Sequence, residues 1–229
     1  MSPAAHAVSG GAAARDGEVP WQVAVFGAAG DDGISCGGSL IDATTVITAA
    51  HCVHGLDERE VRVGFGDVSA DRLDSTTVLW ITVHADYRPD VLTDDIAILR
   101  LRSPATGRSA SIALAAPGSA PALGTRVFAS GWGRTSEGGP RSAKLKVVAL
   151  TVTDRRSCTA STSSAAGTLC AGASGDGVCR GDSGGPLYRY VDGRPVLVGM
   201  TAFGRTCGDD KPDGFTDIGA YADWIQAHR

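Results

Sequence analysis

Short apolar runs, separated by residues that favour turns, recur along the whole chain. The runs are rich in β-branched residues and too short for typical globular helices, which is the pattern of strands in an all-β protein. The clearest predicted strands cover residues 21–26, 61–63, 78–83, 96–101, 126–129, 145–152 and 196–201.

One helix is predicted, at the C-terminal end. From Ile218 onward, apolar and aromatic residues follow helical spacing: Ile218, Tyr221, Trp224, Ile225 and His228. This stripe would dock on the second half of the chain. Residues 103–124 are rich in Ala, Pro and Ser, which is typical of a connection between two halves.

Composition agrees with an all-β protein and narrows the choice of partners. The 229 residues include 31 glycines and 10 prolines, and the formal net charge is −4. A chain of this length buries a substantial core, as one large domain or as two compact halves. It has no basic block interleaved with aromatic residues and no apolar run of membrane length. We therefore expect neither nucleic acid nor a membrane as a partner.

The six cysteines indicate disulfides, although spacing alone cannot choose among the possible pairings. No C-x-x-C pair is present, so zinc binding and free thiols are the less favoured alternative. Disulfides form in oxidising compartments, and we therefore expect a secreted protein.

The strongest chemical signal is the sequence CRGDSGGP at residues 179–186. Glycines on both sides of Ser183 let the backbone turn tightly and bring the N–H groups of Gly181 and Ser183 close to a substrate carbonyl. Ser183 is therefore a candidate nucleophile, and the two N–H groups are a candidate oxyanion hole. Taken alone, the motif could be an ordinary glycine-rich turn, because a serine hydroxyl needs a base to become nucleophilic.

Two other segments supply a base and a carboxylate. His51 follows the apolar stretch VITAA, and Asp95 directly precedes the apolar stretch IAILRL. His51 is the candidate base and Asp95 the candidate that orients its ring. Singly, these residues would be read as a core histidine and a strand-capping aspartate. The chain order His, Asp, Ser is that of chymotrypsin-type proteases, and it argues against a lipase or esterase.

The chain resembles the trypsin/chymotrypsin family of serine proteases over almost its whole length. Beyond the three segments above, the motifs in the family's order are PWQV at 20–23, CGGSLI at 36–41, GWG at 131–133 and YADWI at 221–225. The resemblance implies an all-β fold of two six-stranded antiparallel β-barrels with a C-terminal α-helix. We accordingly divide the chain into an N-terminal barrel (8–112) and a C-terminal barrel with the helix (113–229), which together form one peptidase domain.

The resemblance also implies the activity and its partners. Such a protein is a secreted serine endopeptidase that works through an acyl-enzyme, without a cofactor or a metal. We expect a monomer that acts on polypeptide substrates and meets protein protease inhibitors. A catalytically silent, protease-like binding protein is the alternative from another class. The disulfides that the family pattern implies are Cys36–Cys52, Cys158–Cys170 and Cys179–Cys207.

The N-terminal segment resembles the family's activation sequence. Val8-Ser9-Gly10-Gly11 stands where relatives carry a sequence like Ile-Val-Gly-Gly, whose freed amine pairs with the aspartate before the nucleophile. The resemblance therefore implies a Val8–Asp182 ion pair and a latent zymogen while residues 1–7 remain attached. Ala5-His6-Ala7 resembles a signal-peptidase site, so we interpret residues 1–7 as a signal or propeptide remnant. An artificial or uncut extension is the alternative.

The specificity pocket leaves two interpretations open. By family position its residues are Gly177, Val178, Ala202, Phe203, Gly204 and Asp213. Trypsins carry aspartate at the first of these positions and glycine at the last, whereas the exchange seen here resembles elastases and broad-specificity crab collagenases. If Val178 covers the Asp213 carboxylate, small to medium aliphatic residues before the scissile bond are preferred. If Asp213 is accessible, cleavage is broad or trypsin-like, after Arg or Lys.

Three smaller expectations concern nearby residues. Ala202 lacks the hydroxyl that bonds the catalytic aspartate in relatives, so Asp95 is expected to be less well satisfied. Asp176 is expected to face solvent rather than the pocket. The carboxylates Asp67, Asp71 and Asp74 are interpreted as surface groups rather than calcium ligands.

Overall fold

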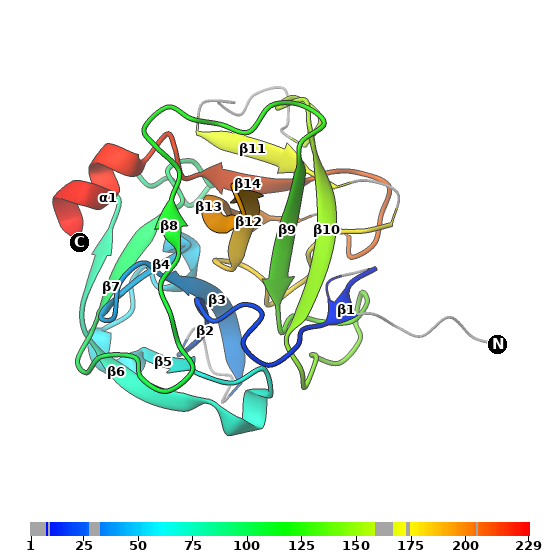
Figure 1. The fold of residues 1–229 in the computed structure, drawn as a ribbon. Coiled ribbons are helices and arrows are strands. Elements are labelled where there is room, and N and C mark those ends of the chain that lie inside the picture. The colour runs from blue at the N-terminus through cyan, green and yellow to red at the C-terminus, as the bar shows by residue number, and fades with distance from the viewer. Residues whose placement is uncertain (1–7, 9, 28–32, 159–166, 173–174, 205) are drawn as a thin grey trace.

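The structure is a computed structural model that describes residues 8, 10–27, 33–158, 167–172, 175–204 and 206–229 (Figure 1). Six antiparallel strands close the first barrel in the order β2-β3-β4-β7-β6-β5. Their bounds are β2 Gln22–Phe26, β3 Ile34–Leu40, β4 Thr45–Thr48, β5 Arg62–Phe65, β6 Asp74–Val83 and β7 Ala97–Leu101. Three short 3-10 helices, η1 Ala50–Cys52, η2 Glu58–Glu60 and η3 Ala70–Arg72, interrupt this half.

The second barrel is formed by six further antiparallel strands. They are β9 Arg126–Gly131, β10 Lys146–Thr153, β11 Thr168–Ala171, β12 Pro186–Val191, β13 Arg194–Phe203 and β14 Asp213–Asp217. Their order is β10-β11-β14-β13-β12-β9, and pairing of β9 with β10 closes the ring. The prediction of an all-β protein with two six-stranded barrels is therefore confirmed (Figure 1).

Two short strands attach distant segments to the second barrel. β1 (Ala12–Ala13) pairs with β10, so the segment that follows Val8 lies against the second barrel rather than the first. β8 (Ala113–Leu114), inside the Ala-rich connection, pairs in parallel with β13.

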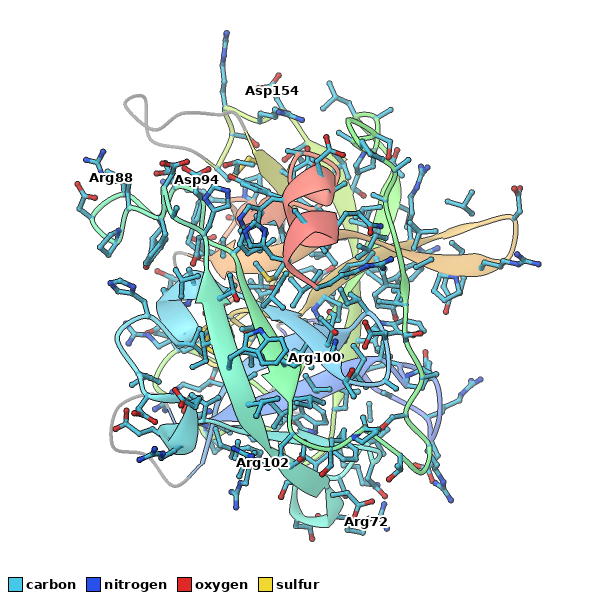
Figure 2. All side chains as sticks on the ribbon, turned by 90° about the vertical axis from the view of Figure 1, so that its left-hand side faces the viewer. Arg72, Arg88, Asp94, Arg100, Arg102 and Asp154 are labelled. Carbon is cyan, nitrogen blue, oxygen red and sulfur yellow. A yellow bond between two sulfur atoms is a disulfide. The ribbon has the colours of Figure 1, made fainter. Side chains whose placement is uncertain are left out.

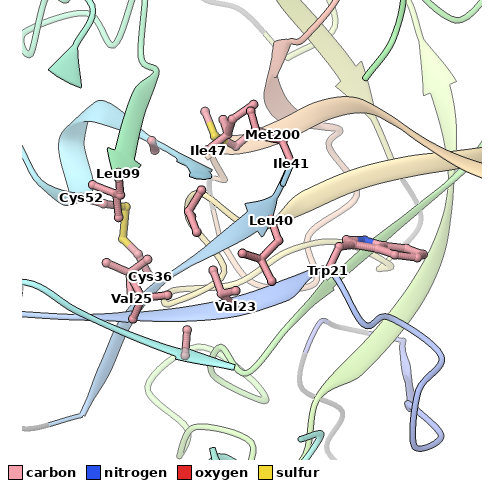
Figure 3. Close-up of a cluster of buried hydrophobic side chains, with 14 of the residues drawn as sticks. Trp21, Val23, Val25, Cys36, Leu40, Ile41, Ile47, Cys52, Leu99 and Met200 are labelled. Carbon is pink, nitrogen blue, oxygen red and sulfur yellow. A yellow bond between two sulfur atoms is a disulfide. The ribbon is translucent and has the colours of Figure 1, made fainter. Parts of the chain in front are cut away.

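The cores of the two barrels are not independent. β4 and β7 pair through buried β-branched and leucine side chains, with Ile47 opposite Ile98 and Val46 opposite Leu99. The buried cluster that contains them continues into the second barrel through Trp132, Tyr188, Leu197 and Met200. Figure 3 shows Met200 close to Ile47 and Ile41 of the first barrel. This shared apolar packing fixes how the barrels face each other.

The predicted helix is present but shorter than its apolar pattern. α1 covers Ala222–His228 and begins after Ile218, where the pattern predicted it to start. The Ile218 N–H instead donates to the Val198 carbonyl, which extends the strand pairing, and the Asp217 carboxylate accepts the Gly219 N–H in a turn. Ile218 and Ile225 are nevertheless both buried, so the docking of the helix is as expected.

Three disulfides join Cys36 to Cys52, Cys158 to Cys170 and Cys179 to Cys207. These are the pairs that the family resemblance implied. Among the described residues, the longest α-helix has seven residues, too few to cross a bilayer.

Candidate active site

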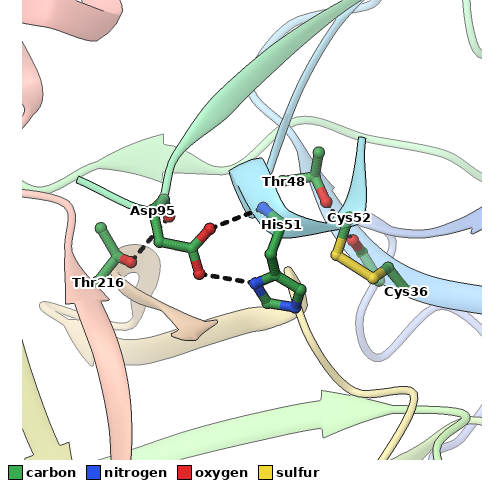
Figure 4. Close-up of polar contacts among 7 residues, drawn as sticks. Cys36, Thr48, His51, Cys52, Asp95 and Thr216 are labelled. Carbon is green, nitrogen blue, oxygen red and sulfur yellow. Dashed lines mark hydrogen bonds and ion pairs between the residues drawn. A yellow bond between two sulfur atoms is a disulfide. The ribbon is translucent and has the colours of Figure 1, made fainter. Parts of the chain in front are cut away.

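His51 and Asp95 meet at the edge of the first barrel. β4 runs into η1 through Ala49 and Ala50, whose small buried side chains leave room beside the imidazole. Asp95 lies just before β7, and its side chain is 1% exposed, against 26% for His51. The carboxylate accepts the His51 backbone N–H at 2.9 Å, and its other oxygen lies 2.7 Å from Nδ1 of the ring (Figure 4). The imidazole is thus held with Nε2 available to a second group.

Asp95 has one hydrogen-bond partner that the sequence analysis did not predict. Among the described residues, its carboxylate receives hydrogen bonds only from His51, because Ala202 offers no hydroxyl. The hydroxyl of Thr216 on β14 instead donates to the Asp95 backbone carbonyl at 3.0 Å (Figure 4). This bond ties the carboxylate-bearing turn of the first barrel to the second barrel. Thr216 was not singled out from the sequence.

The neighbouring Asp94 has a separate role. Its backbone has a positive φ of 53°, which is uncommon for a residue other than glycine. The hydroxyl of Tyr221 donates to Asp94 Oδ1 at 2.9 Å. Figure 2 shows Asp94 on the side of the molecule that carries α1, with Arg100 and Arg102 further down the first barrel.

The Ser183 loop is pressed against the first barrel. The N–H of Gly37 on β3 donates to the Ser183 carbonyl at 2.7 Å. Gly184 has a φ of 76°, and a Cβ added to it would lie 3.0 Å from the backbone nitrogen of Ala49. Only glycine fits there, so the tight turn predicted from the motif has a steric reason. Between the described residues Ser183 and His51 no hydrogen bond is formed; such bonds commonly tighten when substrate binds.

The Gly181 and Ser183 N–H groups lie on the same loop. Gly181 has a φ of 95°, a conformation that favours glycine. Within the described part of the chain, neither N–H donates to a protein acceptor, although the flanking Asp182 and Gly184 N–H groups both do. Two unoccupied donors beside a serine are the arrangement that an oxyanion requires.

Asp182 is completely buried beneath this loop. Its carboxylate accepts the Gly133 N–H at 2.8 Å and the Cys179 N–H at 2.9 Å. The pKa of Asp182 is raised to about 6, because the effect of burial exceeds the opposite effects of the two N–H groups and of the Arg141 charge. A Cβ on Gly133 would stand 2.5 Å from the carboxyl carbon, so the site has no space for a side chain there.

Val8 is fully buried and belongs to the apolar cluster of the second barrel. The Gly11 N–H donates to its carbonyl at 2.8 Å. Residues 1–7 and Ser9, which carry the predicted processing site and part of the activation sequence, lie outside the described residues. Asp176 is exposed, as expected, and its carboxylate occupies the space where a side chain on Gly10 would stand.

A cavity of about 260 Å³ opens beside Ser183. It is lined by Val178, Cys179, Arg180, Ser183, Thr201, Ala202, Phe203, Gly204 and Cys207. Four of the six predicted pocket residues therefore line it, whereas Gly177 and Asp213 lie next to it. Thr201 is a lining residue that the sequence did not suggest; its hydroxyl is buried and has no hydrogen-bond partner among the described residues. Its place directly before Ala202 on β13 was the available signal.

Asp213 lies next to this cavity and has little contact with solvent. It is 6% exposed, and its Oδ2 accepts the Val178 N–H at 2.7 Å. A side chain at Gly177 would overlap this oxygen, which explains the paired occurrence of glycine and aspartate at the two positions. Burial raises the pKa of Asp213 to about 7.

Three potential metal ligands, Cys36, Cys52 and Asp67, are already committed to other contacts. The sulfurs of Cys36 and Cys52 lie near His51 but are joined to each other. Asp67 accepts a hydrogen bond from Arg72 at 2.9 Å and another from the Ser69 N–H. These contacts leave no thiolate near the imidazole and tie the Asp67 carboxylate to a cation.

Comparison with known proteins gives consistent matches along the chain. The profile of the family described as Trypsin matches residues 8–225. Trypsin alpha-4 of Lucilia cuprina is 33% identical over 95% of this chain and 86% of its own length. Brachyurin of Leptuca pugilator is 34% identical over 96% of this chain and 97% of its own. Serine protease SP24D of Anopheles gambiae is 34% identical over 96% of this chain and 80% of its own.

Proposed function

The chain belongs to the trypsin family and is a serine endopeptidase, and from this premise we propose that His51, Asp95 and Ser183 carry its chemistry. The observation that supports this assignment best is the two-point contact between Asp95 and His51. Ser183 Oγ attacks the substrate carbonyl while His51 takes its proton. His51 then protonates the leaving amine, and water hydrolyses the acyl-enzyme by the same route.

The N–H groups of Gly181 and Ser183 hold the oxyanion that forms at each step. Support for this role comes from the glycine-specific conformation of Gly181 and from the fact that neither N–H has an acceptor among the described residues. Donors fixed in this way stabilise charge in the transition state without having to reorganise.

The Val8 amine, once freed, is proposed to pair with Asp182 and switch the oxyanion loop on. Both residues are fully buried, and two N–H groups are the only hydrogen-bond donors to the Asp182 carboxylate among the described residues. Burial of a carboxylate is costly, and the charge of Arg141 offsets that cost only in part, so a new amine is expected to have a large effect. Removal of residues 1–7 would supply that amine.

The preferred substrate residue before the scissile bond is proposed to be small to medium and aliphatic. Val178, Ala202 and Phe203 give the cavity apolar walls, and Asp213 is not among its lining residues. A cationic side chain would have to give up its hydration without a direct partner on the cavity surface. Cleavage after Arg or Lys through Asp213 is the alternative, because Gly204 places no side chain at the cavity wall.

The protein is proposed to be secreted and monomeric, and to meet polypeptide substrates and protein inhibitors. The three disulfides support an oxidising compartment. Sizing chromatography of the secreted protein tests the monomer, and N-terminal sequencing tests whether the chain then begins at Val8.

Covalent labelling tests the nucleophile. A fluorescent fluorophosphonate is expected to label the chain that begins at Val8, and Ser183→Ala is expected to abolish the label. Ser75→Ala, an exposed serine on β6, is the matched control and should be labelled normally. Labelling of the Ser183→Ala variant would refute the assignment.

A set of peptide substrates that differ only in the residue before the scissile bond tests the pocket. We expect higher kcat/KM for Val, Ala, Leu or Met than for Arg at slightly acidic to neutral pH. Strong cleavage after Arg with none after Val or Leu would favour the alternative.

A further inference from the structure

The two oxygens of Asp213 have different surroundings. Oδ2 accepts the Val178 N–H at 2.7 Å. Oδ1 faces Gly204: a Cβ added to Gly204 would lie 3.0 Å from Oδ1 and 3.7 Å from Val178 Cγ2. Gly204 and Val178 both line the cavity, and Gly204 bears no side chain that could cover Oδ1. One oxygen is therefore committed to the protein, whereas the other accepts no hydrogen bond from the described residues and lies beside a residue that lines the cavity.

The charges that act on Asp213 favour its neutral form. Burial raises its pKa to about 7; the Val178 N–H opposes this, and the carboxylates of Asp209 and Asp182 add to it. The positions paired with β14 on its two neighbouring strands are non-ionisable, with Ala171 opposite Asp213 and Phe203 opposite Gly214. The other described charged residues of the flanking loops are exposed: Asp176, Arg180, Asp210 and Lys211. Arg205 lies outside the described residues.

We propose that Asp213 gives this cavity two substrate classes and that pH selects between them. With a neutral carboxyl group the cavity takes aliphatic side chains, and with a carboxylate it also takes Arg or Lys, whose charged head reaches Oδ1 over Gly204. This inference rests on the proposed function, because it assigns a condition to each of the two substrate classes considered there.

The physical basis is the cost of moving a cation out of water. Beside Val178 and Ala202, a guanidinium or ammonium group loses hydration, and a neutral acid does not compensate for that loss. A carboxylate does, through a charge-assisted hydrogen bond in a site of low dielectric. An aliphatic side chain needs no such partner, so its binding changes little when Asp213 ionises.

The size of the effect follows from the titration. For a pKa of about 7, the ionised fraction of a carboxyl group grows about tenfold between pH 6 and pH 8. Binding of a cation that requires the carboxylate should rise by the same factor. The same catalytic residues act on both substrates, so the ratio of kcat/KM for Arg to kcat/KM for Leu reports on the pocket.

Binding of benzamidine, a small aromatic cation, tests the proposal without any catalytic step. Calorimetry on the chain that begins at Val8 should show affinity rising about tenfold from pH 6 to pH 8. Asp213→Asn should bind weakly at both pH values, whereas Asp210→Asn, on the exposed part of the same loop, should behave as the unmodified chain does. Equal affinity at the two pH values, or no binding at either, would overturn the proposal.

The kinetic test uses matched Arg and Leu substrates over the same pH range. The Arg-to-Leu ratio should rise about tenfold in the unmodified chain and stay flat in Asp213→Asn. Asp209→Asn should move the midpoint of the rise to lower pH, because a carboxylate that raises the pKa of Asp213 is removed. If fluorophosphonate labels the enzyme but the Arg-to-Leu ratio does not change with pH, the pH selection is wrong and the proposed function stands. If fluorophosphonate does not label the enzyme, the result counts against the proposed function.

Discussion

Asp95 contacts His51 twice, once through the imidazole ring and once through the backbone N–H. The ring contact fixes which nitrogen faces the substrate, and the backbone contact fixes the position of the 3-10 turn that carries the ring. Because the carboxylate is 1% exposed, water cannot readily replace either bond. The base is therefore set by a single buried side chain of the same barrel.

Replacing that side chain should impair the chemistry far more than binding. In Asp95→Asn the amide can accept only one of the two bonds, and the ring is free to adopt the wrong tautomer. We expect kcat to fall about 10⁴-fold with little change in KM. Asp94→Asn, whose side chain hydrogen-bonds to the Tyr221 hydroxyl and not to His51, is the neighbouring control and should stay within a few-fold. A loss of less than tenfold in Asp95→Asn would contradict the role assigned to it.

Gly133→Ala should disable the oxyanion loop. The new Cβ would stand 2.5 Å from the Asp182 carboxyl carbon, so the carboxylate must move and the Gly133 N–H bond is lost. We expect kcat to fall about 100-fold or more, as for the loss of an oxyanion donor. Gly33→Ala, where nothing lies within 4 Å of the added carbon, should be nearly silent. Full activity of both variants would show that the Asp182 position does not control the loop.

Freeing Val8 should stabilise the fold and raise activity together. A chain made to begin at Val8 carries an amine that can compensate the buried Asp182, whereas the 229-residue chain does not. We expect a higher Tm and a higher kcat for the shorter chain. The decisive comparison is with Asp182→Asn, in which both differences should disappear. If the two lengths are equally active, Val8 is not part of a switch.

The raised pKa of Asp213 makes a prediction about stability. Its folded-state pKa of about 7 lies above the ordinary 3.8, so the folded state binds this proton more tightly than the unfolded chain does. The resulting stability is fully present below about pH 4 and is lost as the pH rises through about 7. At pH 8, the free energy of unfolding of Asp213→Asn, measured by urea titration, should therefore exceed that of the unmodified chain by on the order of 2–4 kcal/mol. At pH 4 the two should be equal. An equal difference at both pH values would exclude this origin.

Two of the disulfides should separate stability from activity. Removing Cys179–Cys207, which spans 28 residues, should cost about 3–4 kcal/mol and also loosen the cavity wall that both cysteines line. Removing Cys158–Cys170, which spans 12 residues and does not line the cavity, should cost about 3 kcal/mol and leave kcat/KM almost unchanged. Double Cys→Ala variants, compared by urea unfolding and by peptide hydrolysis, measure both quantities. Equal losses of activity in the two variants would contradict the expectation.

Much of the framework could be predicted because it lies in local sequence. The β-branched runs in β6 and β10 and the apolar run in β7 indicate strands by composition alone. The Ser183 motif predicts a tight turn because glycine is sterically required there. By contrast, β14 begins Asp213-Gly214 and reads as a turn, and only pairing with β11 and β13 makes it a strand.

The details of the pocket could not be derived because they depend on contacts across the fold. Whether Asp213 lines the cavity or lies beside it is decided by its bond to the Val178 N–H, and no pattern encodes that bond. Thr216 and Thr201 were missed for the same reason, since an isolated threonine on a strand gives no sign of which group its hydroxyl meets. The start of α1 depended similarly on the Ile218 N–H, which continues the sheet.

The division of the site between the two barrels sets the order of events during synthesis. The ribosome delivers the segments that carry His51 and Asp95 first, and Ser183 follows only after three of the six strands of the second barrel have been made. Until that barrel folds and its loop docks against Gly37, the emerging polypeptide has a base but no attacking group. A half-made chain is consequently harmless to the machinery that produces it.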